Sequence, residues 1–416
     1  MDAYVCGLCL LAKQLPDLTQ VTTSLTKNFT GNAMSFEFRT VPHIISETGC
    51  TANLGNILAD HVSSRRIMVV TDKGLVDAGV IAPVLDSLKA AEFTVTVFDA
   101  VVADPPEALV EAAVVQAQNN EVGVVLGLGG GSSMDVAKLV SVLAIGTQKL
   151  SEMYGVGNVT GGRLPLIQIP TTAGTGSEVT PISIVTTGET TKLGIVSPQL
   201  YADIAILDAQ LTTGLPARHT AATGIDAMVH AIEAYTSKLK KNPVSDALAR
   251  EALRLLAGNL VKACTHGDDL VARQNMLLGA MLAGQAFANA PVAAVHALAY
   301  PIGGIFHVPH GLSNALVLPH VLRFNATAAA PLYAELAPIF KPGAEGSDEA
   351  LTVTLIEALD ELADAVAIDK RLSDVGINHN DLPRMAEDAM LQTRLLINNP
   401  REVTQDDALA IYQAAL

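Results

Sequence analysis

The sequence predicts an α/β domain built on a mainly parallel sheet, followed by an all-helical domain. Between about residues 50 and 210, apolar runs rich in β-branched residues alternate with helical patterns, which is typical of βαβ units around a buried parallel sheet. After Pro216 these runs cease, and apolar residues recur at i, i+3 and i+4, which indicates helices. Half of the 416 residues are hydrophobic and only 16% are charged, so the chain can bury a large core and favours two domains.

The α/β part is expected to follow a regular order along the chain. Helical patterns occupy residues 52–62, 82–92, 107–118 and 133–145. Strand patterns occupy 66–72, 94–98 and 122–128, and shorter ones follow at 164–172, 183–187, 192–197 and 203–209. The helical part shows its clearest amphipathic segments at 227–237, 246–264 and 354–367.

We place the domain boundary near residue 213, because Gly214 and Pro216 interrupt the pattern there. The expected parts are an N-terminal extension over 1–33, the α/β domain over 34–213 and the helical domain over 214–416. The first fifteen residues carry no basic residue before their short apolar run, so they make a poor secretory signal. Met34 is the alternative first residue.

Composition bounds the partners and the compartment. A formal net charge of −16 argues against nucleic acid or an anionic membrane as a partner, because binding to either depends on Lys and Arg. Only four cysteines occur, which is no secreted disulfide framework and fits a reducing cytoplasm. The pair Cys6-x-x-Cys9 lacks a second pair and does not by itself indicate zinc.

One long segment is free of charge. No Asp, Glu, Lys or Arg occurs between Arg273 and Arg323, as in membrane-spanning helices. Prolines and histidines interrupt it, and a lipid-facing helix would leave their polar groups unpaired. We interpret the segment as a dry protein core that holds a polar site.

A glycine turn in the first half has the composition of a phosphate site. Gly129, Gly130 and Gly131 follow a strand pattern and precede a helical one, so free N–H groups at the helix start can face a phosphate. Ser132 and Asp135 have the spacing of a capping box, which predicts where that helix begins. The run is neither a Walker A motif nor a full dinucleotide fingerprint, and a turn needed only for packing is the alternative.

Two further polar features follow predicted strands. The run PTTAGTGSEVT, residues 170–180, and Asp72 both stand at the carboxyl ends of strands, where open α/β sheets bind ligands. A carboxylate at residue 72 can accept the ribose hydroxyls and repel a 2′-phosphate, which favours NAD over NADP. The alternatives are an ordinary polar loop and, for Asp72, a helix cap or a solvated turn.

The second half contains a candidate metal site. Asp226 and His230 are four residues apart in a helical pattern, so they share a face, and Glu233 lies on it too. His296 and His310 frame an uncharged segment that is expected to fold back through Pro301 and the two glycines after it. Imidazoles converging with a carboxylate suit a divalent transition metal. A surface hydrogen bond and satisfied core histidines are the alternatives.

Four motifs, in this order, resemble those of the iron-containing (group III) alcohol dehydrogenases: GGGSSMDVAK, IPTTAGTGSEVT, GIDAMVHAIEAY and HALAYPIGGIFHVPHG. The resemblance runs from about Met34 to the C-terminus. It implies a dinucleotide-binding domain, a helical domain and a metal in the cleft between them. It also implies NAD as cofactor, iron(II) as the metal with zinc as the alternative, an alcohol or aldehyde substrate, and a homodimer.

The resemblance assigns roles to individual residues. The metal ligands of the family fall on Asp226, His230, His296 and His310. Its diphosphate- and ribose-binding residues fall on Asp72, Gly130, Gly131, Ser132 and Asp135, and positions lining the nicotinamide and its ribose fall on Thr171, Thr172, Thr175, Thr180 and Lys192.

One position departs from the family pattern. Many relatives have a further histidine four residues after the third ligand, where this chain has Tyr300. Its hydroxyl is a weak base at neutral pH, so we expect either a hydrogen bond to the substrate oxygen or simple packing beside the cofactor.

The reaction implied is hydride transfer between an alcohol bound at the open metal position and NAD. Two other functions stay open on the sequence alone: a lyase of the dehydroquinate synthase type, which returns NAD unchanged, and a non-catalytic nucleotide- or metal-binding protein.

Overall fold

The computed structural model describes residues 35–188 and 191–416. The predicted extension 1–33, Met34 and the Cys6-x-x-Cys9 pair lie outside the described residues. Residues Phe38–Leu416 form one compact unit, which contains all the helices and strands of the described residues.

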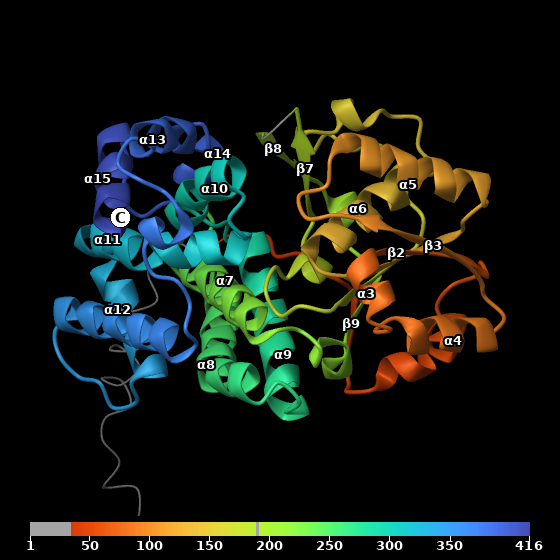
Figure 1. Ribbon diagram of the computed structural model, residues 1–416, viewed down its shortest axis with the longest axis horizontal. Coiled ribbons are helices and arrows are strands. Elements are labelled where there is room, and N and C mark those ends of the chain that lie inside the picture. Colours follow the sequence, from red (N-terminus) through yellow and green to blue (C-terminus); the bar gives the residue numbers. More distant parts are fainter. Residues whose placement is uncertain (1–34, 189–190) are drawn as a thin grey trace, which may run out of the picture. The chain divides into compact units, whose positions relative to one another are not determined.

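A six-stranded, fully parallel sheet organises the first half (Figure 1). Its order across the sheet is β1 (His43–Ser46), β9 (Ile204–Leu207), β6 (Leu166–Pro170), β4 (Val124–Gly129), β2 (Arg66–Asp72) and β3 (Thr94–Val101). Every neighbouring pair is parallel. The predicted α/β class is therefore confirmed, and β1 is an edge strand that the sequence patterns did not reveal.

Side-chain alternation along the strands builds a core on each face of this sheet. Ile67 and Val69 of β2 pack with α2 (Leu54–Ala59) and α4 (Ala82–Ala90). Met68 and Val70 point the other way and join the core that includes α5 (Glu107–Asn119) and α6 (Gly131–Leu143). This second core is continuous with that of the helical half. Helix α6 is buried against the large sheet, α5 and β7.

A smaller sheet adjoins the large one. It contains β5 (Gly155–Val156), β8 (Thr191–Val196) and β7 (Ile182–Thr187), and β7 pairs antiparallel with β8. The strands predicted at 183–187 and 192–197 are present, but they form this hairpin instead of extending the parallel sheet. The hairpin brings Lys192 beside the candidate site.

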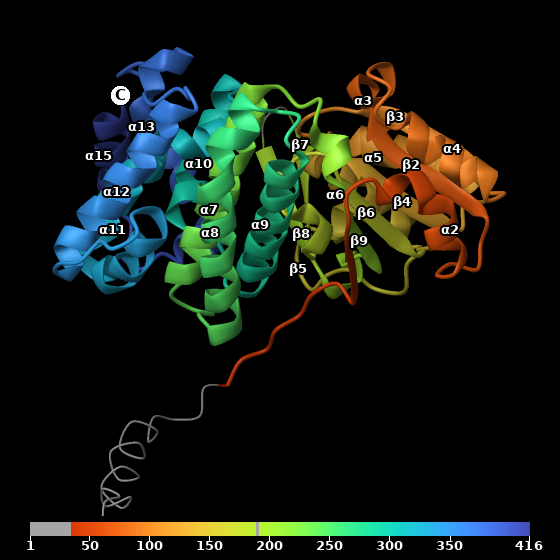
Figure 2. The same cartoon turned by 90° about the horizontal axis from the view of Figure 1, so that it is seen from below.

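Beyond Leu207 the described residues form helices and no further strand. The long helices are α7 (Ala217–Thr236), α8 (Pro243–Thr265), α9 (Leu270–Asn289), α10 (Ala294–Phe306), α11 (His310–Phe340) and α12 (Asp348–Ala365), and α13 (Leu382–Met390), α14 (Thr393–Leu396) and α15 (Gln405–Ala415) follow. Helices α7, α8 and α9 pack side by side (Figure 2). Short elements are α3 (Lys73–Asp77), η1 (Cys50–Asn53), η2 (Leu150–Glu152), η3 (Ser177–Val179), η4 (Pro198–Leu200), η5 (Ala209–Thr212) and η6 (Leu372–Val375).

The chain reverses between α10 and α11, later than expected. Helix α10 continues through Pro301, and the turn is made by His307, whose φ of 56° is left-handed, together with Val308 and Pro309. The prediction of a turn at Pro301 and the following glycines is therefore wrong. The later turn lets α10 carry His296 while α11 starts at His310.

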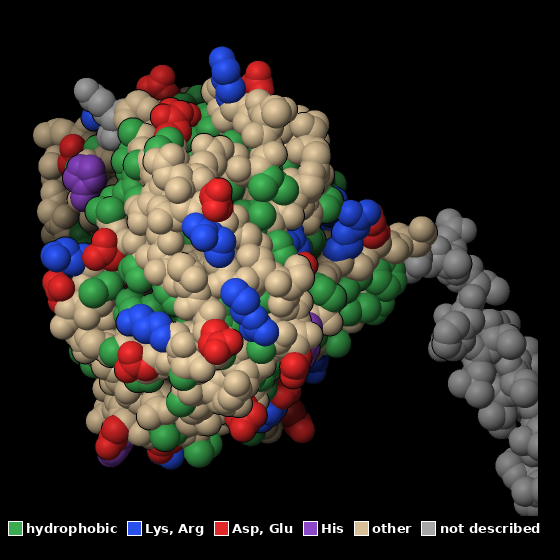
Figure 3. Space-filling model, turned by 90° about the vertical axis from the view of Figure 1, so that its right-hand side faces the viewer, with side chains coloured by type: hydrophobic (Ala, Val, Ile, Leu, Met, Phe, Trp, Pro, Cys, Tyr) green, Lys and Arg blue, Asp and Glu red, His purple; other side chains and the backbone are tan. Residues whose placement is uncertain are grey.

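In the described part of the chain no single helix is long and apolar enough to cross a membrane. The pair α9 and α10 passes the length and composition criteria together, with a bend of 108° between them. On the molecular face drawn in Figure 3, basic and acidic side chains are interspersed, with no broad area of one sign.

Candidate metal centre and nucleotide pocket

Three of the four predicted metal ligands converge. Helix α7 supplies Asp226, α10 supplies His296, and α11 begins with His310. One donor atom from each lies within 4.8 Å of the other two. The Asp226 Oδ1 atom is 3.9 Å from His296 Nε2 and 3.7 Å from His310 Nε2. Because ligand atoms lie about 2.0–2.2 Å from a zinc-like cation, two of them are at most about 4.4 Å apart, and both distances fit that limit.

The predicted fourth residue, His230, lies beside this cluster but outside the group of three. Its ring stacks on that of His296, with 4.7 Å between centroids, and lines the same pocket. Its Nδ1 atom is buried without a hydrogen-bond partner. A buried imidazole that stacks on His296, next to three converging donors, is a further feature that suits a cation.

The protonation of the cluster suits metal binding. Burial lowers the pKa of His230 to about 3, and the enclosed position of His310 lowers its pKa to about 4. Burial opposes ionisation of Asp226, but the surrounding histidines hold its pKa below the usual value. Near neutral pH these residues therefore offer free imidazole nitrogens and an ionised carboxylate, which are the forms that bind metals.

Glu233 orients one of these imidazoles. Its Oε2 atom lies 2.6 Å from His296 Nδ1, and its Oε1 atom accepts a 2.7 Å hydrogen bond from the backbone N–H of Val295. Since an ionised carboxylate only accepts, Nδ1 of His296 carries the proton and Nε2 keeps its lone pair toward Asp226. Carboxylates commonly fix metal-binding histidines in this way.

Asn314 is a further polar side chain against the cluster. It follows His310 by one turn of α11, and its Nδ2 donates a 2.6 Å hydrogen bond to Asp226 Oδ1. The same atom lies 3.3 Å from the Nε2 atoms of His296 and His310. Asn314 Oδ1 is buried and has no partner.

The glycine turn opens helix α6, but the predicted capping box is wrong. Gly130 is the N-cap, and no side chain caps the helix. Asp135 instead accepts 2.6 Å and 2.9 Å hydrogen bonds from Ser177 Oγ and the Ile184 backbone N–H. It therefore fastens α6 to η3 and to strand β7. The first N–H groups of α6 have no side-chain cap that would compete with a phosphate.

The polar run 170–180 packs tightly beneath this turn. A Cβ atom on Gly131 would lie 2.9 Å from Thr175 Cγ2, so a side chain at residue 131 would collide with the run. Gly176 is left-handed, with φ of 61°, and a Cβ there would lie 2.6 Å from the Gly284 Cα of α9. Only glycine permits both the conformation and this approach. The backbone N–H of Thr171 bonds to the Gly129 carbonyl, at 2.9 Å.

Asp72 ends strand β2 and caps α3. Its Oδ1 atom accepts a 3.0 Å hydrogen bond from the Leu75 backbone N–H. The structure therefore contains the helix cap that was the alternative interpretation of this residue. The hydrogen bond of the cap uses the Oδ1 oxygen of Asp72. Binding of the adenine ribose by this carboxylate stays a prediction.

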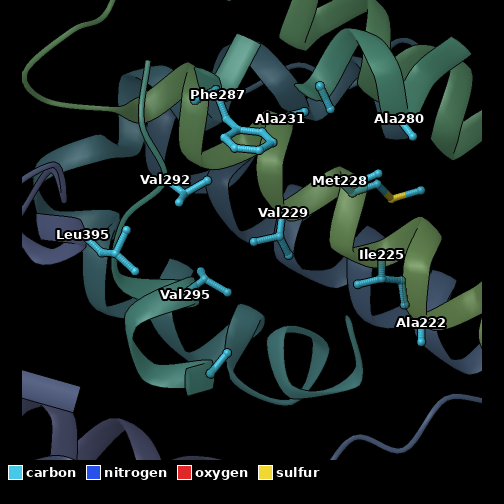
Figure 4. Close-up of a cluster of buried hydrophobic side chains, with 14 of the residues drawn as sticks. Ala222, Ile225, Met228, Val229, Ala231, Ala280, Phe287, Val292, Val295 and Leu395 are labelled. Carbon is cyan, nitrogen blue, oxygen red and sulfur yellow. The ribbon is translucent and has the colours of Figure 1, made fainter. Parts of the chain in front are cut away.

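A pocket of about 190 Å³ extends from the candidate metal-binding residues His296 and His310 to the glycine turn. Ten predicted residues line it: Gly131, Ser132, Asp135, Thr175, Thr180, Lys192, His230, His296, Tyr300 and His310. Five do not: Asp72, Gly130, Thr171, Thr172 and Asp226. Phe287, Val292 and Leu395 form an apolar part of the wall, and they lie next to one another in Figure 4.

Comparisons with known proteins identify the family of this chain. A family model described as iron-containing alcohol dehydrogenase matches residues 42–209, and one for the C-terminal part of the Fe-containing alcohol dehydrogenase family matches residues 220–416. The chain is 42% identical over 361 residues to long-chain-alcohol dehydrogenase 1 of Geobacillus thermodenitrificans, which covers 85% of this chain and 90% of that protein. The chain belongs to the iron-containing alcohol dehydrogenase family.

Solved structures of this family share the fold. A structure of 1,3-propanediol oxidoreductase is 34% identical, with a TM-score of 0.89 over 92% of this chain and all of that one. Sulfoacetaldehyde reductase from Bifidobacterium kashiwanohense in complex with NAD⁺ is 28% identical, with a TM-score of 0.82 over 92% of this chain and 99% of that one. The fold and the family expected from the four motifs are thus confirmed.

Tyr300, the residue predicted to contact the substrate or the nicotinamide, lies in the same pocket. Its ring is 6.1 Å from that of His310, centroid to centroid, and it lines the pocket. Burial raises the pKa of its hydroxyl, although the Arg394 guanidinium opposes the shift. The side chain therefore stays protonated near neutral pH and can donate a hydrogen bond.

The sequence patterns did not identify several polar residues that lie in or beside the pocket. Asp104 follows β3, and its Oδ1 pairs with Lys192 Nζ at 2.7 Å. Lys138 of α6 is fully buried under the pocket, where its Nζ donates to Ser177 Oγ at 2.7 Å and to the Ile182 carbonyl at 2.6 Å. Asn314 has a local signal, its i+4 spacing from His310, whereas Asp104 and Lys138 depend on long-range contacts.

Proposed function

We propose that this protein is an NAD-dependent and metal-dependent alcohol dehydrogenase that also reduces aldehydes. The convergence of Asp226, His296 and His310 at one end of a pocket whose other end is the glycine turn supports this most directly. A metal and a dinucleotide held at these two ends would meet in the space between them. Membership of the iron-containing family supports the same activity.

We assign the metal to Asp226, His230, His296 and His310, with iron(II) as the ion and zinc as the alternative. When bound, such a cation acts as a Lewis acid that polarises the substrate oxygen and lowers the pKa of an alcohol hydroxyl. One carboxylate and three imidazoles suit either metal.

We assign NAD to the residues around the glycine turn, with its diphosphate on Gly130, Gly131 and Ser132 and its adenine ribose on Asp72. When bound, the nicotinamide accepts or delivers the hydride. The remaining assignments are Asp135, Thr171, Thr172, Thr175, Thr180 and Lys192. Asp135 acts through Ser177 and the Ile184 N–H, which keep the 170–180 run against α6.

The chain's own residues prepare the reaction in three ways. Glu233 keeps the proton of His296 on Nδ1, so Nε2 faces the cluster as an acceptor. Tyr300 lines the same pocket, where its phenolic hydroxyl can donate to the substrate oxygen. The apolar wall excludes water, which strengthens electrostatic interactions with the reacting oxygen.

We further propose the division into 34–213 and 214–416, a homodimer, a cytoplasmic location, and no nucleic-acid or membrane partner. The acidic net charge of −16 and the low cysteine content support the last two. The oligomeric prediction is tested by light scattering, with an expected mass of twice the 43.3 kDa chain.

The activity is tested by following NADH absorbance with a panel of alcohols and aldehydes. We expect net oxidation or reduction of the cofactor, which a lyase of the dehydroquinate synthase type does not produce. Absence of any net change after reconstitution with iron(II) and with zinc would reject the proposal.

A further inference from the structure

Arg394 places a cation in the pocket wall. It belongs to the short helix α14 and lines the same pocket as His296, His310 and Tyr300. Its Nη2 atom lies 3.6 Å from the Cβ position of Gly194 in β8, so the side chain reaches from the helical half to the hairpin. Within residues 35–188 and 191–416 its guanidinium has no hydrogen bond and no ion pair.

The other charged side chains that line the pocket are paired. Lys192 contacts Asp104 at 2.7 Å, and Asp135 is held by Ser177 Oγ and by the buried ammonium of Lys138 at 3.4 Å. Each of these carboxylates thus has a nearby ammonium group of opposite charge. The guanidinium of Arg394 is the exception among the lining residues that the structure describes, so it is available to a ligand.

Apolar side chains make up another part of the lining of this pocket. Ile182 and Ile184 of β7 form one part of the wall, and Phe287, Val292 and Leu395 form another. Such walls accommodate the methylene groups of a short carbon chain and exclude water around it. The lining of one pocket therefore combines metal-binding side chains, apolar side chains and the cation of Arg394.

We propose that Arg394 binds an anionic group at the far end of the substrate, so that the preferred substrates carry an aldehyde or alcohol at one end and a carboxylate or sulfonate at the other. This inference rests on the proposed dehydrogenase function. A guanidinium suits such groups because its planar N–H pairs bind two oxygens at once. In a chain of net charge −16, it supplies a local attraction that the molecule as a whole lacks.

The test compares aldehydes that differ only in charge. Initial rates are measured with 4-oxobutanoate and its methyl ester, and with 6-oxohexanoate and its methyl ester. The two chain lengths place the anionic group at two different distances from the aldehyde. A sulfonate, 3-oxopropane-1-sulfonate, distinguishes the two kinds of anion. The variants are Arg394→Gln, Arg394→Lys, and Arg384→Gln as a control of equal charge change on an exposed arginine of α13 outside the pocket.

We expect the wild type to prefer the anion over the ester in kcat/KM for at least one length. Arg394→Gln should lower that ratio by about tenfold, the size of one exposed charge-assisted hydrogen bond. Arg394→Lys should keep part of the preference, and Arg384→Gln should leave it unchanged. Raising the ionic strength should increase the KM of the anion more than that of the ester, and only when Arg394 is present.

A binding measurement separates this inference from the dehydrogenase function. Calorimetry with 4-hydroxybutanoate and 1,4-butanediol compares an anionic with a neutral alcohol without requiring turnover. Tighter binding of the anion that is lost in Arg394→Gln supports the inference even if no aldehyde is reduced. In the binding measurement, equal affinity for both alcohols would overturn it. In the rate measurement, it would be overturned by an Arg394→Gln variant that lowers kcat/KM for anion and ester alike, or that changes only the KM for NADH.

Discussion

Replacing Glu233 with Gln is the sharpest test of how the helices prepare the metal site. The carboxylate accepts two hydrogen bonds at once, 2.6 Å from His296 Nδ1 and 2.7 Å from the Val295 N–H. A glutamine offers one acceptor and one donor. Its NH₂ group must therefore face either the Val295 N–H or the imidazole.

Both orientations of that glutamine carry a cost. Facing the Val295 N–H, the amide leaves a buried donor unsatisfied, at about 1–3 kcal/mol. Facing His296, it moves the ring proton to Nε2 and removes the lone pair that the metal needs. We expect the metal affinity to fall by about 10- to 100-fold, as for other groups that orient metal-binding histidines.

The assay is anaerobic competition between the protein and a chelator of known affinity, with iron(II) and separately with zinc. Glu251→Gln removes the same charge from an exposed position of α8 and serves as the control. A Glu233→Gln protein that binds both metals within about twofold of wild type, or a control that weakens binding equally, would refute the orienting role.

Three further predictions follow from the geometry. Asp72→Gly should raise the NADP:NAD ratio of kcat/KM by about tenfold or more, because a carboxylate would repel the 2′-phosphate; Asp72→Ser, which keeps a cap acceptor, should do the same, and an unchanged ratio in both counts against the ribose role. Gly311→Ala should destabilise the fold by about 1–3 kcal/mol and weaken metal binding, because its Cβ would lie 2.3 Å from the Ala222 carbonyl of α7, whereas Gly258→Ala meets nothing within 4 Å; calorimetric melting compares them. Burial raises the pKa of Glu178 from 4.5 to about 7, so the folded protein binds a proton there more tightly than the unfolded chain does. This contribution to stability, up to about 3 kcal/mol, is present at low pH and is lost as the pH rises through 7. The melting temperature of Glu178→Gln should therefore rise relative to that of the wild type between pH 5 and 8, and a difference that stays constant with pH would contradict this.

The elements with strong periodicity were predictable from local sequence. Strand β2 was predicted at 66–72 and spans Arg66–Asp72, and the helix predicted at 246–264 lies within α8. These segments are long enough for side-chain period to decide their type. Strand β1 has four residues, three of them only partly buried, so its local pattern is too weak to predict.

Where long-range contacts decide, local spacing misled. Ser132 and Asp135 have capping-box spacing, but Asp135 finds partners more than forty residues away, in Ser177 and Ile184. Pro301 suggested a turn, yet α10 continues past it and reverses only after His307 takes a left-handed conformation. Neither outcome is visible without the packing of the rest of the chain.

The candidate site also contains residues that local sequence predicts and residues that it does not. The i, i+4 pair on α7 and the two histidines framing an uncharged segment were visible in the sequence, because function there depends on residue type and helical spacing. Arg394 belongs to no local motif and enters the pocket from a four-residue helix near the C-terminus. Its contribution emerges only when the helical half folds against the β7–β8 hairpin.

The metal content of anaerobically purified protein shows whether a cation held at Asp226, His296 and His310 is required for activity. Elemental analysis should find about one iron or zinc per chain in the wild type, and His296→Ala should lose both the metal and the turnover of NADH. A wild-type protein that keeps full activity after chelation has removed its metal, or a His296→Ala variant with normal metal content, would contradict the account.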